Sequence, residues 1–332
     1  MASSPTLSVP HYQGNAANPA RLFTDLGTGL LVFTGEDAES FLQGQFSSDL
    51  HALAHGAIQL SSYNSPKGRM LATLVLWRDG GAIRALVAAD LAESLRKRLS
   101  MYVLRAKVAV ADPTPSHLLL GVGGADAGNA VRAACGNAPD RGQVIVGDAR
   151  TLIGLPDGRI VVIAPAATAG TLRDRLASAT TAGSADDWRW LGVRAGVPTL
   201  HAATQDLFVP QTANWDLLGG VNFQKGCYPG QEIVARMQYL GRLKERLQLF
   251  HVDAVPPLPA TRIYGSVFAD QACGTVVDAA SAPDGGCDLL AVLQLSALDG
   301  TLCLGAPDGP ALTTLPLPYA IPAPVAPNRP KL

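Results

Sequence analysis

The sequence predicts an α+β protein built of three units, and three features of the chain support this fold class. The segments Asp112–Ser116 and Thr181–Ala185 consist of residues that interrupt regular structure, and they mark two boundaries. Between these boundaries strand and helix patterns alternate, as in a small α+β sandwich. Beyond Gly241 helical periodicity disappears and short β-rich runs follow between turns. The last unit is therefore expected to be a small β-barrel or sandwich.

The first unit is expected to combine a sheet with two helices. An apolar strand over Gly29–Phe33 precedes a helix over Gly35–Gln45, and two β-rich runs cover Met70–Arg78 and Ala82–Ala89. Asp-Gly-Gly between the two runs is a strong hairpin signal. Asp90 is expected to cap a helix that reaches about Leu104, because leucines then recur at four-residue steps.

The later elements are predicted from the same periodicities. Two helices follow the second boundary, and the second of them opens at Pro229 and ends at Gly241, which is the expected C′ residue. In the middle unit the expected elements are strands at Leu118–Val122, Val144 and Arg159–Ile163 and helices over Asp126–Cys135 and Thr168–Ala179. Elsewhere they are a helix over Asp186–Ala195 and strands over Arg246–Val252, Arg262–Phe268, Thr275–Ala279 and Leu289–Leu295.

Composition excludes several classes of protein. Hydrophobic types make up 48% of the 332 residues and charged types 16%, so the chain is able to bury a core and is not disordered throughout. The 26 basic and 27 acidic residues give a net charge of −1, which disfavours direct non-specific binding to nucleic acid. Apolar runs are far shorter than the roughly 20 residues that span a bilayer, and residues 1–20 lack the pattern of a signal peptide. We therefore expect a cytoplasmic protein without a membrane partner.

Three features are weak indicators of a site. Five widely spaced cysteines without a Cys-x-x-Cys pair predict neither disulfides nor a metal site. The run from Gly121 to Asp126 resembles a dinucleotide-binding loop, but Asp126 stands where the last glycine belongs, and an ordinary strand-to-helix turn is favoured. His51 and His55 suit metal binding on a helix, yet solvated loop histidines are the favoured interpretation.

The segment from Phe223 to Arg236 is the strongest indicator of a site in the sequence. Cys227 lies beside Lys225 and ahead of a helix N-terminus, and both features favour the thiolate by lowering the pKa of the thiol. The helix amides would also accept an anionic ligand group, and Gln231 and Glu232 lie in the first turn. The alternative is an ordinary helix start with an inert cysteine.

A second candidate is the pair Trp188 and Trp190, which lie on different faces of one helix. One of the two rings is therefore free to stack on a flat heterocycle.

The run Lys225-Gly-Cys-Tyr-Pro-Gly-Gln-Glu232 closely resembles the signature of the YgfZ family. This family is related to the aminomethyltransferase, or T-protein, of the glycine cleavage system. Other segments are similar to the family in the same order along nearly the whole chain. They are Phe41–Gln45, Pro66–Arg69, Trp188, Ala195–Pro198, Phe208–Gln211, Asn214, Gly219–Gly220 and Pro316–Tyr319.

The resemblance implies a three-domain ring with two ferredoxin-like α+β domains and a C-terminal small β-barrel. The domains would be 1–111 with 184–240, then 112–183, then 241–332. It implies tetrahydrofolate in a central cavity and a role in the assembly or repair of iron–sulfur enzymes, and through them in tRNA modification. Iron–sulfur enzymes or cluster-assembly proteins would be the partners. The implied reactive group is Cys227 with Lys225, and the implied folate-binding residues are Trp188, Thr28, Tyr228, Gln231, Glu232 and Arg236.

Three departures from the related patterns bear on function. Thr28 stands where the family carries a tryptophan that holds the folate ring, and a threonine is unable to stack. Glu245 dilutes a normally basic stretch after the signature helix. Leu71 and Ala72 occupy the places of the T-protein's acidic pair, so aminomethyl transfer, the alternative function, lacks the carboxylate that orients the folate amine. A further alternative is a non-catalytic scaffold that binds a partner protein and uses folate only as a ligand, and the sequence does not separate this role from catalysis.

Overall fold

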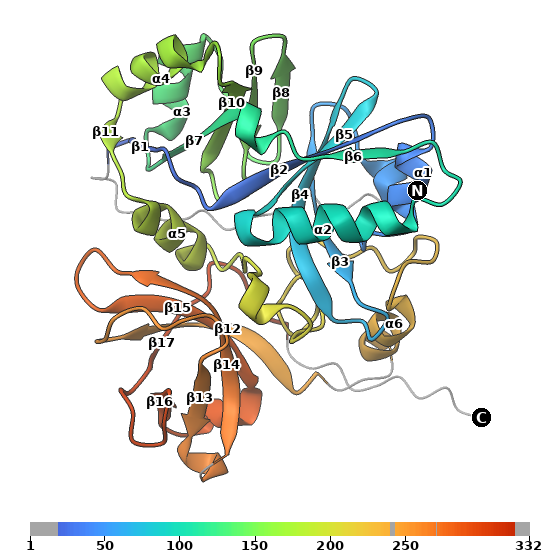
Figure 1. Cartoon of the computed structure of the whole chain (residues 1–332). Coiled ribbons are helices and arrows are strands. Elements are labelled where there is room, and N and C mark those ends of the chain that lie inside the picture. Colours follow the sequence, from blue (N-terminus) through green and yellow to red (C-terminus); the bar gives the residue numbers. More distant parts are fainter. Residues whose placement is uncertain (1–18, 240–242, 270, 323–332) are drawn as a thin grey trace.

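A computed structural model describes residues 19–239, 243–269 and 271–322 of the chain. It contains three antiparallel-rich sheets with helices between and around them (Figure 1). The predicted α+β class is therefore confirmed. The predicted ring and the exact domain division stay predictions.

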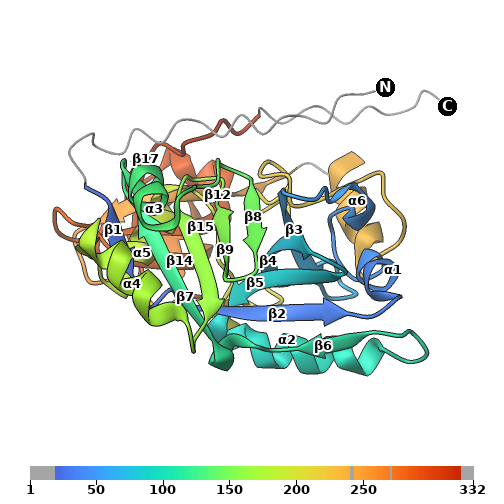
Figure 2. The same cartoon turned by 90° about the horizontal axis from the view of Figure 1, so that it is seen from above.

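The first sheet has five strands in the order β3-β4-β5-β2-β6 and carries helices α1 and α2. Helix α2 lies along β2, as Figure 2 shows, and buries Leu91, Leu95 and Leu99 against the sheet. The bounds are β2 Thr28–Thr34, β3 Ile58–Asn64, β4 Met70–Asp79, β5 Ala82–Ala88, β6 Ala109–Ala111, α1 Ala38–Gln43 and α2 Ala89–Tyr102.

The second sheet has six strands in the order β11-β1-β7-β10-β9-β8, and helices α3 and α4 pack together on it. Strand β1 pairs with β7 and β11, so a strand that precedes the first sheet in sequence belongs to the second sheet in space. The bounds are β1 Arg21–Phe23, β7 His117–Gly123, β8 Val144–Gly147, β9 Arg150–Gly154, β10 Ile160–Pro165, β11 Thr181–Ala182, α3 Ala127–Cys135 and α4 Ala169–Ser178.

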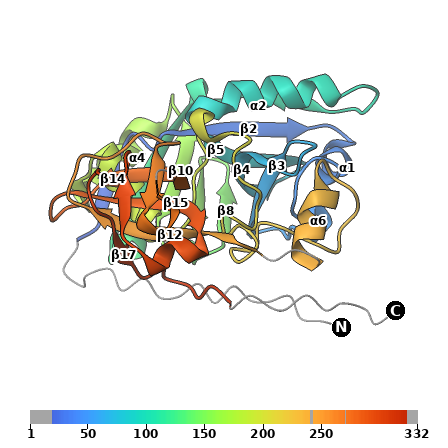
Figure 3. The ribbon, with the colours of Figure 1, turned by 90° about the horizontal axis from the view of Figure 1, so that it is seen from below.

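The third sheet has six strands in the order β16-β13-β14-β15-β12-β17. Helix α5 packs on β14 and β15 of this sheet and also contacts β7 of the second sheet. Figure 3 shows α6 beside α1, away from the third sheet. The bounds are β12 Glu245–Val252, β13 Arg262–Gly265, β14 Ala272–Ser281, β15 Cys287–Gln294, β16 Leu302–Leu304, β17 Thr313–Leu315, α5 Ala185–Arg194 and α6 Gln231–Tyr239.

One apolar cluster joins the first and third sheets. It contains residues of β4 and β5 together with Leu247, Val277 and Leu290 of the third sheet, and Trp215 lies between them. Burial of so many apolar side chains in one continuous cluster stabilises the arrangement of the sheets as well as each sheet alone. The cavity described below lies where the three sheets meet.

Most expected elements are present, and three local expectations need comment. The hairpin turn lies where Asp-Gly-Gly predicts it, with Gly80 at φ +57°. The predicted cap at Asp90 is wrong: the helix starts at Ala89 with Ala88 as its N-cap, two residues earlier, and the Asp90 carboxylate instead accepts a hydrogen bond from the Ala202 amide. The predicted helix end at Gly241 lies outside the described residues.

Candidate functional site

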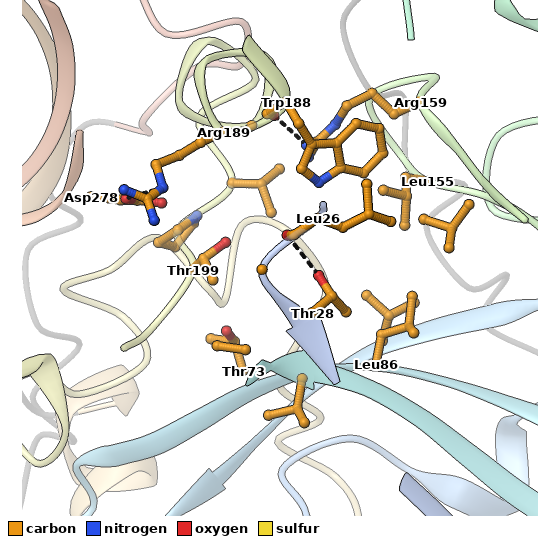
Figure 4. Close-up of a pocket in the computed structure, with 18 of the residues that line it drawn as sticks. Leu26, Thr28, Thr73, Leu86, Leu155, Arg159, Trp188, Arg189, Thr199 and Asp278 are labelled. Atoms are coloured by element: carbon orange, nitrogen blue, oxygen red, sulfur yellow. Dashed lines mark hydrogen bonds and ion pairs between the residues drawn. The ribbon is translucent and has the colours of Figure 1, made fainter. Parts of the chain in front are cut away.

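A cavity of about 220 Å³ lies where the three sheets meet, and side chains of all three line it (Figure 4). The first sheet contributes Thr28 of β2 and Thr73 to Val75 of β4, and the second contributes Leu155, Pro156, Asp157, Arg159 and Val161. Helix α5 contributes Trp188 and Arg189, and Asp278 reaches the cavity from β14. The site is therefore assembled from residues that are up to 253 positions apart in the sequence, since Asp25 and Asp278 both line it.

Trp188 forms one wall of this cavity, as the sequence predicts. Its ring is 6% exposed and packs at a tilt against Phe23, with 5.2 Å between the ring centroids. The guanidinium of Arg159 lies over the ring, 4.3 Å from its centroid, in a cation–π contact. A Cβ on Gly121 would lie 2.6 Å from the tryptophan ring, so only glycine fits at that place on β7.

Arg159 is fixed in this position by its own hydrogen bonds. Its Nε donates to Asp157 Oδ2 at 2.7 Å, and its Nη1 donates to the main-chain oxygen of Trp188 at 2.9 Å. Both members of the Arg159–Asp157 pair are largely buried. The Arg159–Asp157 pair therefore forms part of the cavity wall beside Trp188, and its two opposite charges neutralise each other.

The opposite, polar part of the cavity is formed by Asp278, Arg189 and His201. Asp278 Oδ1 lies 3.6 Å from His201 Nε2 and 3.8 Å from Arg189 Nε. The Asp278 carboxylate raises the pKa of His201, although burial acts against this shift. Figure 4 shows Asp278 and Arg189 on the side of the cavity away from Leu86 and Leu155.

Thr28 also lines the cavity, where its hydroxyl donates to the Leu26 main-chain oxygen at 3.1 Å. Thr28 therefore offers a small side chain and no ring at the position where the family resemblance places a tryptophan. Strand β4 presents Thr73, Leu74 and Val75 to the cavity, while Leu71 and Ala72 are buried. No β4 residue that lines the cavity carries a carboxylate.

The signature residues form a second region, away from this cavity. Residues 225–236 are all described, and none of them lines it. The Lys225 ammonium donates to three main-chain oxygens at the end of α1 and just beyond it, those of Gln43, Phe46 and Ser48. An ammonium has three N–H donors, so all three are used. Lys225 therefore holds the turn against the first sheet and the helix α1 that it carries. Among the described residues, no hydrogen bond joins Lys225 to Cys227 that would support the predicted effect of the lysine on the thiol.

Lys225 is 8% exposed, and this burial lowers its pKa to about 8, while the nearby Asp49 acts in the opposite direction. The ammonium also lies 5.2 Å from the centroid of the Tyr228 ring. Burial raises the pKa of Tyr228 to about 12, and its hydroxyl has no hydrogen-bond partner among the residues that the structure describes. Tyr228 thus acts as packing for the lysine in this arrangement.

The same turn is held to the loop that contains Pro66-Lys-Gly-Arg69. Gly68 and Gly230 approach so closely that a Cβ on Gly230 would lie 2.5 Å from the Gly68 Cα. Both glycines have positive φ, at +71° and +76°. The side chain of Gln231 donates to the Lys225 main-chain oxygen at 3.2 Å. Two sequence motifs about 160 residues apart therefore form one folded unit.

Cys227 is exposed at the tip of this unit, as are Glu232 and Arg236 on α6. The other cysteines differ from it: Cys135, Cys273 and Cys287 are buried, and Cys303 is half-buried. Burial raises the pKa of the first three thiols. The most accessible thiol of the described chain is therefore the one in the signature.

The sequence-predicted residues are thus divided between two regions. Trp188 and Thr28 lie in the cavity, whereas the others lie in the signature turn and α6. Sequence reasoning missed Arg159, His201 and Asp278. Of these three, Asp278 could have been singled out from the sequence, because it is a lone carboxylate within the apolar run from Val276 to Ala280.

The weaker candidates have structural explanations. His51 and His55 are exposed, and His51 contacts Glu39 at 2.9 Å. The glycine-rich run leads from β7 into α3 beside a second cavity of about 400 Å³. Within the described ranges no group of three His, Cys, Asp or Glu residues is able to hold a metal ion. In those ranges no helix has the length and apolar character needed to cross a membrane.

Comparison with known proteins defines first the class and then the family. No family model matches the chain. The glycine cleavage system aminomethyltransferase T from Bartonella henselae superposes with a TM-score of 0.74 at 16% identity, covering 92% of this chain and 87% of that one. The protein therefore has the aminomethyltransferase T fold.

Curated relatives give the family. The tRNA-modifying protein YgfZ of Shigella sonnei (strain Ss046) is 31% identical over 312 residues, which are 92% of this chain and 95% of the relative. The protein of the same name from Escherichia fergusonii is 34% identical over 238 residues, or 71% and 73% of the two chains. The chain belongs to the YgfZ family, and the resemblance based on the signature is confirmed.

Proposed function

We propose that the protein binds tetrahydrofolate in the central cavity and supports the assembly or repair of iron–sulfur enzymes, and through them tRNA modification. The observation that carries this proposal is the cavity between the three sheets, with Trp188 as an aromatic wall. Apolar, partly aromatic walls with a few polar groups are typical of small-molecule sites. The curated relatives are named tRNA-modifying proteins, which supports the last part of the proposal.

The chemistry of the cavity fits the ring of a folate. Leu26, Leu86, Leu155 and Val161 supply apolar contact for a flat heterocycle beside Trp188. The opposite part of the cavity holds buried polar groups with unused hydrogen-bonding capacity, including His201 Nε2. At about 220 Å³, the cavity is smaller than the roughly 300–1,000 Å³ of pockets that enclose a whole drug-sized ligand. It therefore suits the bicyclic ring, with the rest of the folate extending outward.

The second functional group of the proposal is the Cys227 thiol. The signature turn holds it at the surface through buried anchors, so it is accessible to a partner protein. The partners we propose are iron–sulfur enzymes or the proteins that assemble their clusters. Tyr228 and Gln231 serve the shape of the turn in this scheme. Glu232 and Arg236 on α6 are exposed and available to the same partner.

Aminomethyl transfer is the alternative, and the shared T-protein fold is the observation that favours it. The first sheet argues against it, because β4 presents only Thr73, Leu74 and Val75 to the cavity. Strand β4 therefore lacks the carboxylate that the comparison with the T-protein pattern places there to orient the folate amine during aminomethyl transfer. A glycine-cleavage assay with purified protein separates the two functions, and we expect no aminomethyl transfer.

Two measurements test the proposal. Mass spectrometry of small molecules released from the purified protein should identify a reduced folate, and calorimetry should show saturable binding of tetrahydrofolate. In a strain that lacks the protein, wild type should restore iron–sulfur enzyme activity and Cys227→Ser should not. A wild-type protein that neither carries nor binds tetrahydrofolate would remove the folate part. Full complementation by Cys227→Ser would remove the thiol part.

A further inference from the structure

Asp278 is a buried carboxylate placed at the cavity by an irregularity of its strand. It is 4% exposed and lies in β14 between Val277 and Ala279. The register of β14 against β15 shifts between Val276 and Asp278, which marks a β-bulge. Bulges change the direction in which a side chain points and are frequent near functional sites. Here the bulge coincides with the residue that reaches the cavity.

This carboxylate has unused hydrogen-bonding capacity. Oδ1 accepts a hydrogen bond from the Ala279 amide at 2.9 Å, and both His201 and Arg189 lie beyond hydrogen-bonding distance of it. No residue of the described chain donates to Oδ2. A carboxylate accepts about four hydrogen bonds, and a buried one is costly when they are missing.

His201, which faces Asp278, also has unused hydrogen-bonding capacity. His201 Nε2 is buried and has no hydrogen-bond partner among the described residues. Arg189, the third charged group, has a side chain that is 47% exposed, so water satisfies much of it. The polar part of the cavity therefore presents a buried acceptor and a buried ring nitrogen side by side.

The other carboxylates at the cavity do not share this property. Asp157 is paired with Arg159 at 2.7 Å. Asp25 is exposed, and its Oδ1 accepts a hydrogen bond from the Gly27 amide at 3.0 Å. Among the residues that line the cavity, Asp278 is therefore the carboxylate that is both buried and short of donors.

We infer that Asp278 binds the amino-pyrimidine edge of the folate ring, accepting hydrogen bonds from its 2-amino group and N3–H, while His201 Nε2 donates to the 4-oxo oxygen. This inference rests on the proposed function and assigns the group that orients its ligand. The two ring donors are parallel and adjacent, which matches the two oxygens of a carboxylate. The edge of the ring then faces the third sheet, and its flat face lies against the apolar wall.

The test measures binding by calorimetry with two ligands and three proteins. The ligands are tetrahydrofolate and an analogue with hydrogen in place of the 2-amino group. The proteins are wild type, Asp278→Asn, and Asp253→Asn as a matched control at an exposed carboxylate just beyond the end of β12. We expect Asp278→Asn to bind tetrahydrofolate roughly tenfold or more weakly, as the loss of a charge-assisted hydrogen bond implies. Asp253→Asn should bind it like wild type.

Comparison of the two ligands tests whether Asp278 contacts the 2-amino group itself. Wild type should bind it roughly tenfold more weakly than tetrahydrofolate, whereas Asp278→Asn should bind both ligands alike, because the two changes remove the same contact. Equal affinity of Asp278→Asn and Asp253→Asn for tetrahydrofolate would overturn the inference while leaving the proposed function intact. Absence of binding by wild type would instead remove the proposed function. If Asp278→Asn does not fold, equal affinity of wild type for the two ligands still overturns the inference.

Discussion

The central cavity and the signature turn differ in how far the hydrogen-bonding capacity of their buried charged side chains is used. In the signature turn, every donor of the Lys225 ammonium is used on a main-chain oxygen, and Gln231 holds the turn from the other side. In the cavity, Asp278 and His201 Nε2 are buried with capacity to spare. A buried charged group whose hydrogen bonds are all made within the protein stabilises a local shape, whereas one with unused capacity is available to a ligand. The turn is thus a rigid support for an exposed thiol, and the cavity is a site prepared for binding.

The largest expected effect is in the cavity. Trp188→Ala removes a buried ring that packs on Phe23 and Arg159, and we expect it to lower the free energy of unfolding by about 3–5 kcal/mol. It should also weaken tetrahydrofolate binding several-fold or more, because the aromatic wall is lost. Chemical denaturation and calorimetry measure the two effects.

Trp190→Ala is the matched control, since Trp190 lies on the same helix, outside the cavity lining, and donates to Asp288. It should leave the affinity unchanged. If both variants bind tetrahydrofolate like wild type, Trp188 does not form part of the site.

The next effect concerns the support in the signature turn. Lys225→Ala removes the donor of three main-chain oxygens, two of them in buried hydrogen bonds, and we expect a loss of about 3 kcal/mol in the free energy of unfolding. The affinity of the folded variant for tetrahydrofolate should stay unchanged, because Lys225 does not line the cavity. Lys67→Ala, at an exposed lysine, is the control and should have little effect. Equal stability of the two variants would show that the lysine is not an anchor.

A smaller effect on stability is expected at the exposed thiol. Cys227→Ser should change the free energy of unfolding by less than about 0.5 kcal/mol, because an exposed side chain has little packing to lose. In the wild-type protein at neutral pH, iodoacetamide should alkylate Cys227 first and the half-buried Cys303 next. Peptide mass spectrometry over time gives the order. Modification of buried Cys287 at the same rate as Cys227 would contradict the placement of the two thiols.

The smallest expected effect is a pH dependence at the cavity. His201 faces Asp278, Asp90 and Arg189, and the Asp278 carboxylate raises the pKa of the imidazole. The stabilisation from the protonated histidine is complete below its unfolded pKa and is lost as the pH rises through the higher folded value. The excess in melting temperature of wild type over His201→Gln should therefore shrink as the pH rises above the ordinary histidine pKa of 6.5. A constant or growing excess would contradict this assignment.

Much of the fold could be predicted from local pattern, because the local signals agree with the final structure. The hairpin of β4 and β5 follows from its turn residues and its apolar runs. Strand β3 was missed, since its polar residues Ser61, Ser62 and Asn64 are buried and hide the alternation of a strand. Strand β1 lies in the second sheet through long-range pairing with β7, which no local pattern reports.

The site was predictable only in part, because local sequence pattern does not report which distant residues the fold brings together. A contiguous motif identified the signature turn, but not the three main-chain acceptors that take up the charge of Lys225. The cavity combines single residues of three sheets, and in the sequence each looks like ordinary strand or loop. Asp278 was visible as a carboxylate in an apolar run, yet only the fold places it opposite His201.

The central claim is that tetrahydrofolate binds between the three sheets and not at the signature turn. A crystal structure of the full chain with tetrahydrofolate tests it most directly. We expect the ring of the ligand beside Trp188, with its amino-pyrimidine edge at Asp278 and Cys227 left exposed. A ligand bound at Cys227 or on α6, with the central cavity unchanged, would contradict the claim.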